Sequence, residues 1–188
     1  MTLHDMLPAP VVPNDTVEKA WPTRLWLGTI SPDLDEQLLG RELRTSAASG
    51  CRDLEAETVL DSAQASAVFD GLALQIHTGP RGTVRLRVQV WSAGHRIPLT
   101  YGNAAWSAWC YLAVEGPGGD SRSGAICLHD PRAGCDLATV PGLPWGRALT
   151  LQAEPGLAVI APGWLASSVL PVSTGHAVAV LLAHGEQG

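Results

Sequence analysis

The clearest pattern in the sequence is a strict alternation of apolar and polar residues from Val84 to Val90. Successive side chains of a strand point to opposite faces of a sheet, so this period of two predicts a half-buried β-strand. Short apolar runs separated by Gly, Pro and Asp continue along the rest of the chain and predict further strands. These strands are expected at residues 106–114, 124–128, 148–152, 157–161 and 178–183, with an earlier one at 21–28.

The part of the chain before this alternation has a helical period instead. Leucines at positions 34, 38, 39 and 43 mark one helical face, and Ser31 and Pro32 are placed to cap the helix and form its first turn. A second helix is predicted over residues 61–76, where Val68, Leu72 and Ile76 recur every four residues, and Gly79–Gly82 ends it. Helices followed by many short strands indicate an α+β protein built around a β-sandwich or barrel.

The 188 residues are enough for one hydrophobic core, so we expect a single domain over residues 1–188. Within it we expect a proline-rich leading segment (1–20), a strand and helices (21–82) and the β-barrel core (83–188). No apolar run approaches the roughly 18 residues that a membrane helix needs, so no membrane association is expected. The first residues do not combine a basic segment with an apolar one, and a cytoplasmic location is therefore expected.

Charge and cysteine content exclude other classes. A net charge of −6 gives no basic field to attract a phosphate backbone, so nucleic acid is not an expected partner. The four cysteines are scattered and form no Cys-x-x-Cys pair, which argues against a disulfide framework or a cysteine metal site. The sequence leaves a homodimer open.

Three segments carry a resemblance to a known family: residues 106–112 (WSAWCYL), 123–132 (SGAICLHDPR) and 155–165 (PGLAVIAPGWL). In order and spacing they resemble the motifs of a small bacterial group of iron(II) and 2-oxoglutarate dependent oxygenases. Trp21-Pro-Thr23 is similar to an early Phe-Pro-Thr of that group. The resemblance implies a double-stranded β-helix, the jelly-roll barrel of cupins and of these oxygenases, preceded by helices that brace one sheet.

The resemblance also implies where iron and its cosubstrate would bind. Such oxygenases hold iron(II) with two His and a carboxylate or a third His. An ungapped reading places the first ligand pair at Leu99 and Tyr101, the distal His at Ser167, and the Arg that clamps 2-oxoglutarate at Val178. Because none of these side chains suits its task, we expect no metal and no cofactor in this barrel. A shift of the alignment could bring His95 toward a ligand position, but one His does not make a site.

The remaining histidines offer little to a metal. His176 and His184 stand eight residues apart on one predicted strand, a span of about 26 Å, so they cannot bind one ion together. Asp130 and Arg132 are expected to pair and fix the loop that follows them.

A barrel without polar ligands becomes an apolar cavity, and its walls and rim supply the candidate site. His95 is the predicted general base because an imidazole titrates close to neutral pH, and Tyr101 is the second predicted catalytic residue. Trp106 and Trp109 differ by an odd number, so only one of them can face the interior of a regular strand. The residues predicted to bind substrate are Trp91, Trp106, Trp109, Arg85, Arg87, Trp164, Ser167 and Val178.

These features support three hypotheses. The first is a cofactor-independent enzyme that binds a hydrophobic, polyketide-like intermediate and promotes its cyclisation or isomerisation by holding a reactive conformer. The second is a non-catalytic small-molecule binding protein or partner subunit. The third is an active iron(II) and 2-oxoglutarate dependent oxygenase whose ligands are displaced from the positions above.

Overall fold

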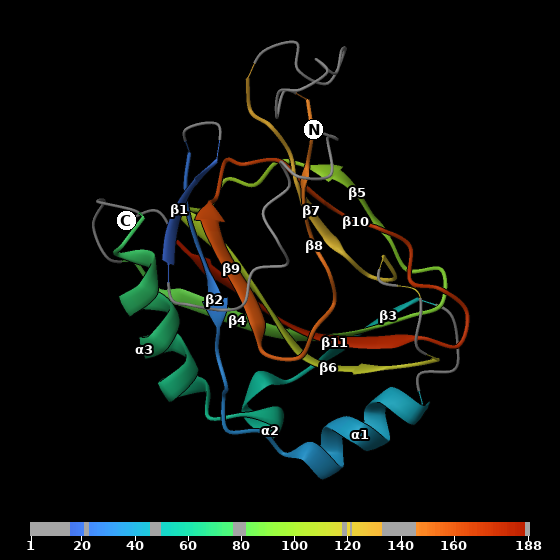
Figure 1. The fold of residues 1–188 in the computed structure, drawn as a ribbon. Helices are drawn as coiled ribbons and strands as arrows, with labels where there is room; N and C mark the ends of the chain where they lie inside the picture. Colours follow the sequence, from blue (N-terminus) through green and yellow to red (C-terminus); the bar gives the residue numbers. More distant parts are fainter. Residues whose placement is uncertain are drawn as a thin grey trace.

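A computed structural model of the chain describes residues 16–20 as backbone, and residues 23–45, 50–76, 82–117, 120, 122–132 and 146–186 in full. These residues form two antiparallel sheets and helices on one side of the larger sheet (Figure 1). The larger, seven-stranded sheet has the order β1-β2-β9-β6-β11-β4-β3, and the smaller, four-stranded sheet has the order β5-β10-β7-β8. Residues 1–15 of the expected leading segment lie outside the described residues. Positions 79–81, where the second helix was expected to end, also lie outside them.

The two sheets are wound from one continuous run of strands. From β4 onward the chain passes back and forth between the sheets, except that β7 and β8 are neighbours in the smaller one. This is the winding of a jelly roll, and it places β9-β6-β11-β4 opposite β5-β10-β7-β8. The strands are β4 (Val84–Ser92), β5 (Ile97–Thr100), β6 (Trp106–Glu115), β7 (Ile126–Leu128), β8 (Leu149–Leu151), β9 (Leu157–Pro162), β10 (Ser167–Val169) and β11 (Ala177–Gly185).

Three more strands widen the larger sheet. At one edge β2 (Thr23–Thr29) pairs with β9, and β1 (Thr16–Ala20) pairs with β2; at the other edge β3 (Cys51–Leu54) pairs with β4. The strands expected from the sequence are all present with small shifts of their ends. The strands β1, β3, β5 and β10 were not predicted, because they are short and carry few apolar residues.

The helices are α1 (Glu36–Thr45), α2 (Ala56–Val59) and α3 (Ser62–Ala73). The predicted start of the first helix was wrong: Leu34 forms an isolated β-bridge with Leu60, and the Asp35 carboxylate caps the helix by accepting a hydrogen bond from the Leu38 backbone N–H at 2.9 Å. In α3 the buried face carries Ala65, Phe69 and Ala73, whereas Val68 is partly exposed. The predicted helix is therefore present with its buried face rotated.

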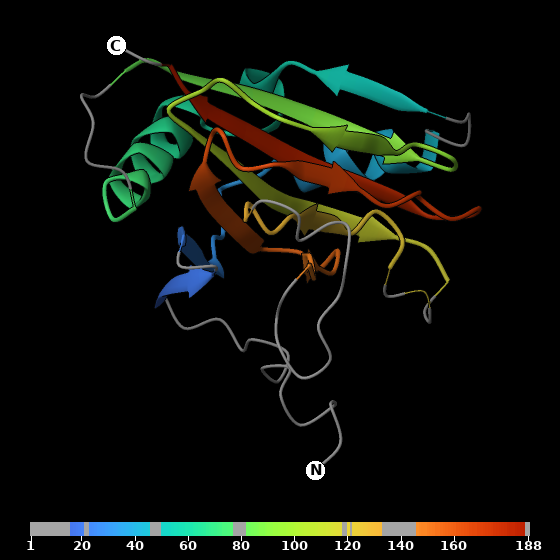
Figure 2. The ribbon, with the colours of Figure 1, turned by 90° about the horizontal axis from the view of Figure 1, so that it is seen from above.

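The larger sheet separates two hydrophobic cores, as the alternation of side chains on its strands requires. On β11, residues 177, 179, 181 and 183 pack against the helices, and residues 178, 180 and 182 face the smaller sheet. Figure 2 shows the long strands β4, β6 and β11 running side by side, with the helices beyond them. The helices thus brace one face, and the other face forms the inner wall of the barrel.

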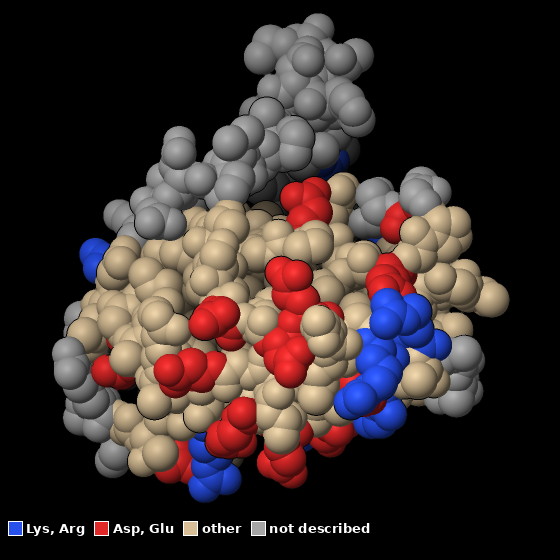
Figure 3. Space-filling model, turned by 90° about the horizontal axis from the view of Figure 1, so that it is seen from below, with Lys and Arg blue, Asp and Glu red and all other residues tan. Residues whose placement is uncertain are grey.

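The helical face carries many charged side chains. Figure 3 shows carboxylates spread over the side of the molecule that carries the helices, with a cluster of basic side chains at one side of it. The exposed carboxylates between positions 33 and 61 are Asp33, Asp35, Glu36, Asp53, Glu55, Glu57 and Asp61. Among the described residues, no helix has the length and apolar character needed to cross a bilayer.

Candidate functional site

Strand direction defines two ends of the barrel. Strands β5, β7, β9 and β11 end at one of them, which we call the mouth, where Gly185 pairs with Trp106, and Ser167 pairs with both Thr100 and Leu128. At the opposite end, which we call the base, Ala177 pairs with Ser92 and Val169 pairs with Ile126. The predicted catalytic residues lie at different ends, because His95 precedes β5 and Tyr101 follows it. Six residues of extended chain separate them by about 20 Å, so they do not form one catalytic pair.

At the base, His95 is part of the packing. Its ring stacks on Trp91 with the ring centroids 5.4 Å apart, and Trp91 is fully buried among the residues of the barrel core. The Trp91 indole N–H donates to Gln89 Oε1 at 2.9 Å. Burial lowers the pKa of His95, and its Nε2 is sealed from solvent without a hydrogen-bond partner. A substrate proton has no access to this nitrogen.

The interior next to the base is filled by side chains. Val178 is fully buried, and a Cβ placed on Gly124 of the opposite wall would come within 3.1 Å of Val178 Cγ2. The Tyr111 hydroxyl crosses the barrel: it accepts from the Ile126 N–H at 2.9 Å and lies 3.0 Å from the Gly124 carbonyl oxygen. Burial raises the pKa of this hydroxyl, which therefore stays protonated. Val178 packs the core and leaves no room for a ligand at its position.

The positions implied for iron lie at the mouth, and their register corrects the ungapped reading. Ser167 pairs with Leu128, whose side chain belongs to the barrel core, so Ser167 faces the interior. Ser167 pairs on β5 with Thr100, and a bulge separates this pair from the pair Val169–Ile97. The interior-facing position on β5 is therefore Thr100 rather than Leu99 or Tyr101.

The residues around these positions do not fit iron(II). From position 98 to 102 the chain reads Pro-Leu-Thr-Tyr-Gly, which offers neither a carboxylate nor an imidazole in any register. In the parts of the chain that the structure describes, no three His, Cys, Asp or Glu side chains gather closely enough to hold a metal ion.

A second polar group faces the interior at the mouth, and it is a pair that the sequence did not reveal. His184 on β11 pairs across the strands with Ser107 on β6, and its Nδ1 lies 3.1 Å from the Ser107 hydroxyl oxygen. Burial, and secondarily the positive charge of Arg87, lower the pKa of His184. At neutral pH its ring is therefore uncharged, with one nitrogen engaged by Ser107. The two residues are separated by 77 positions, so no local motif joins them.

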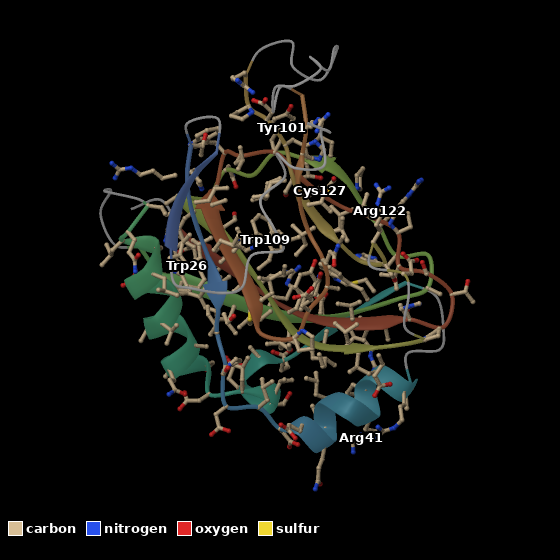
Figure 4. All side chains as sticks on the ribbon, in the orientation of Figure 1. Trp26, Arg41, Tyr101, Trp109, Arg122 and Cys127 are labelled. Carbon is tan, nitrogen blue, oxygen red and sulfur yellow. The ribbon has the colours of Figure 1, made fainter. Side chains whose placement is uncertain are left out.

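Apolar residues lie beneath this pair. Trp109 and Leu182 are the next inward-facing residues on β6 and β11; they pair with each other and keep 8% of their surface exposed. Figure 4 shows Trp109 in the space between the two sheets. Trp106 lies on the other side of the larger sheet, in the core that packs against the helices, and its indole covers Gly185. As the odd spacing predicted, only Trp109 faces the barrel, and Trp106 is not positioned to bind a ligand there.

The two predicted arginines lie on β4 beside the pair. Arg85 is the cross-strand neighbour of His184, and its guanidinium forms an ion pair with Glu186 at 2.5 Å. Arg87 pairs with Leu182 and lies 3.7 Å from the Asp53 carboxylate. Both arginines are largely exposed, so these ion pairs add little stability. They place positive charge along one side of the mouth.

Exposed apolar side chains form the rim of the mouth. Five large hydrophobic side chains are exposed among the described residues, and three of them lie at this end. Leu99 lies within β5 and is 48% exposed, Tyr101 follows β5 and is 71% exposed, and Trp164 follows β9 and is 54% exposed. A Cβ on Gly102 would meet the Gly163 carbonyl oxygen at 2.5 Å and lie 3.9 Å from Ser107 Oγ. The backbone at Gly102, next to Tyr101, thus lies against the backbone at Gly163, next to Trp164, and both lie near the Ser107 hydroxyl. Tyr101 and Trp164 both lie at the mouth, and their roles in catalysis and substrate binding stay predictions.

Asp130 and Arg132 also lie at this end, and they pair as predicted. The buried Asp130 carboxylate accepts from Arg132 Nε at 2.9 Å and from the Gly146 N–H at 3.2 Å. The Arg132 guanidinium lowers the pKa of Asp130. His129 next to it lies 2.8 Å from the Ser168 hydroxyl. Asp130 therefore joins the two sides of the segment 133–145, which lies outside the described residues.

Comparisons with known proteins identify the fold. No family model matches the sequence. No curated protein matches it either. Solved structures do: a prolyl hydroxylase from Trichoplax adhaerens, in complex with a hypoxia inducible factor peptide fragment, has a TM-score of 0.55 at 10% identity, covering 80% of this chain and 76% of that one. A Pseudomonas putida prolyl-4-hydroxylase has a TM-score of 0.53 at 14% identity, covering 73% and 71%.

A third structure is SnoK, a non-heme alpha ketoglutarate dependent carbocyclase from nogalamycin biosynthesis. It has a TM-score of 0.50 at 14% identity and covers 85% of this chain and 79% of that one. Identities this low establish architecture and leave activity open. Together with the strand order, they confirm the fold that the resemblance implied. The chain is an α+β protein with the double-stranded β-helix fold of the 2-oxoglutarate oxygenases, braced by helices that precede the barrel in the sequence.

Proposed function

We propose that this protein is a metal-independent enzyme on an oxygenase-like barrel, which binds an apolar small molecule at the mouth and promotes its isomerisation or cyclisation. The observation that carries the proposal is the chemistry of the ligand positions. Thr100 and Ser167 face the interior where iron ligands would stand, and residues 98–102 provide no alternative ligand. Hydroxyl groups alone are poor ligands for iron(II).

The surroundings of the mouth favour an apolar ligand. Tyr101 and Trp164 expose their rings at the rim, and Trp109 with Leu182 forms an apolar surface below. Aromatic rings that are partly exposed to solvent and partly packed on the protein suit a flat, largely apolar molecule. One protein of this fold is named a carbocyclase, although that enzyme depends on alpha ketoglutarate. We infer that the ligand is held by ring contacts at the rim, with its reacting atoms near the His184–Ser107 pair.

A metal titration tests independence from iron. The purified chain is titrated anaerobically with iron(II), with and without 2-oxoglutarate, and binding is followed by calorimetry. We expect no stoichiometric site in the micromolar range. A site of one iron per chain would overturn the proposal and favour an oxygenase with displaced ligands.

A binding assay tests the apolar mouth. The neutral fluorophore N-phenyl-1-naphthylamine should bind saturably, and Tyr101→Ala and Trp164→Ala should each weaken its binding about twofold to tenfold, the range of a lost aromatic contact. Leu74→Ala is the matched control, because Leu74 is an exposed apolar residue on the helical face, with 42% of its surface exposed. Equal affinity in all variants would place the ligand elsewhere.

A further inference from the structure

The His184–Ser107 pair leads to a more specific proposal, which rests on the function proposed above. We propose that His184 is the general base of the mouth, held in position by Ser107, and that the substrate is an apolar carbonyl compound with an acidic hydrogen on the carbon next to the carbonyl. Arg87 supplies the positive charge that stabilises the enolate oxygen.

The geometry leaves one ring nitrogen of His184 for a ligand. Nδ1 is engaged by the Ser107 hydroxyl at 3.1 Å. Nε2 has no hydrogen bond to the described residues. It also differs from His95 Nε2 and His176 Nδ1, which are buried without a hydrogen-bond partner. A ligand on the apolar surface of Trp109 and Leu182 would lie one inward-facing residue away from His184 along the strand. The ring is thus fixed on one side and open on the other, as a general base requires.

The charged groups around the ring favour its neutral, proton-accepting form. Arg85 and Arg87 lie on the neighbouring strand β4, and Ser107 lies on β6 at the other side. Glu186 follows on the same strand but is ion-paired with Arg85, while Asp53 lies near Arg87 on the side of β3. With burial, the Arg87 charge lowers the pKa of His184. The same charge would stabilise an oxyanion that develops beside the ring.

The reaction balances without a cofactor. In the tautomer whose Nδ1–H donates to Ser107 Oγ, His184 Nε2 accepts the proton from the carbon acid. The electron pair of the broken C–H bond forms the enolate, whose oxygen faces Arg87. The protonated ring then returns the proton either to the far carbon of a conjugated enolate, which shifts a double bond, or to the opposite face of the same carbon, which inverts a stereocentre. No electrons are gained or lost, and the imidazole is restored.

The other described histidines do not meet these requirements. His95 Nε2 and His176 Nδ1 are sealed, and both residues lie toward the base. His129 lies near the mouth, but its Nε2 contacts the hydroxyl of Ser168. Ser168 stands between the inward-facing residues Ser167 and Val169 of β10, so its side chain points away from the interior. His129→Gln and His95→Gln are therefore suitable control variants.

A general base can be tested before the substrate is known. In 5-nitrobenzisoxazole, removal of the proton on C3 breaks the N–O bond and releases a coloured cyanophenolate, so the rate reports proton abstraction directly. We expect catalysis by the full chain with a rate that rises with pH and levels off with an apparent pKa below 6.5, the ordinary value for histidine. His184→Gln should lower this rate at least about a hundredfold, whereas both control variants keep it.

Ser107 is a positioning residue, and its test uses a second readout. In Ser107→Ala the ring loses its hydrogen bond at Nδ1, so the NMR-monitored pKa of His184 and the pH profile of the reaction should shift together. A structural role alone would change thermal unfolding and leave this titration unaltered. Unfolding is measured for every variant, and Ser107→Ala still tests the pair if His184→Gln does not fold.

The outcomes separate this proposal from the broader one. No rate above buffer, or an equal rate in His184→Gln, overturns His184 as the base. Saturable binding of N-phenyl-1-naphthylamine would in that case still support the apolar mouth and would favour a binding protein. Stoichiometric iron would instead overturn the proposed function itself.

Discussion

The base and the mouth of the barrel each combine a tryptophan with a histidine of lowered pKa, in opposite arrangements. At the base, Trp91 and His95 stack on each other, Trp91 is fully buried, and His95 Nε2 is sealed. At the mouth, Trp164 is more than half exposed, and His184 is held by a hydroxyl on one side only. Burial alone therefore does not identify a reactive histidine. What distinguishes the two is whether the second ring nitrogen is left open.

The largest expected effect tests the base as a packing element. Trp91→Ala should lower the free energy of unfolding by about 3–5 kcal/mol, because a large ring is removed from a filled core and its stacking partner is left behind. Urea unfolding followed by far-UV circular dichroism measures this. A loss below about 1 kcal/mol would mean that the base is loosely packed and open to a ligand.

A smaller loss is expected at one residue of the mouth. Asp130→Asn removes the charge that accepts hydrogen bonds from Arg132 and the Gly146 N–H, and it should cost about 1.5–3 kcal/mol. Because the pKa of Asp130 is lowered in the folded state, its contribution is present above the ordinary carboxyl pKa and is lost as the pH falls through the folded value. Urea unfolding at pH 7 and at pH 3 should thus show a smaller difference between variant and parent at pH 3.

Between the two ends, Tyr111→Phe should cost about 1–3 kcal/mol, because the Ile126 N–H loses its buried acceptor. The effect is expected in unfolding experiments, with unchanged binding of N-phenyl-1-naphthylamine at the mouth. A change in that binding with unchanged stability would show that the ligand reaches this depth of the barrel.

The pH dependence of stability compares the two histidines directly. Both have a lowered pKa in the folded state, so each favours folding above about pH 6.5, and this contribution is lost as the pH falls through the folded value. His95→Gln and His184→Gln should each reduce the loss of unfolding free energy between pH 7.5 and pH 5. An unaltered slope in either variant would contradict the lowered pKa of that histidine.

The smallest effect is expected for Trp164→Ala, within about 0.5 kcal/mol of the parent, since exposed residues contribute little to folding. This variant should be distinguished by weaker probe binding alone. A destabilisation similar to that of Trp91→Ala would remove the contrast between the two ends.

The sequence predicted the long elements better than the short ones. Strands such as β4 and β11 carry enough apolar residues to show a period or a continuous run, whereas β5 and β10 have four and three residues and contain Pro, Thr or Ser. These two short strands set the register at the implied iron positions. A bulge between them moved the inward-facing position from Leu99 and Tyr101 to Thr100, and an ungapped alignment cannot detect such a shift.

The candidate site was harder to predict because its central contact is not local. Ser107 and His184 meet only when β6 and β11 pair, and their alignment follows from the strand register. Within the sequence, His184 is an ordinary histidine at the end of an apolar run. The alternation of side chains along a strand was an available signal. Ser107 and Trp109 share one face of β6, and Leu182 and His184 share one face of β11. Once the two strands are paired, this alternation places all four side chains in the barrel.

The contact between Asp130 and Gly146 has an evolutionary consequence. It fixes the chain on both sides of residues 133–145, so that segment can change in length and composition while β7 and β8 keep their pairing. Insertions are tolerated best where the framework around them is already held in place. Sequence changes between these two positions should therefore leave the pairing of β7 with β8, and with it the framework of the barrel, unaltered.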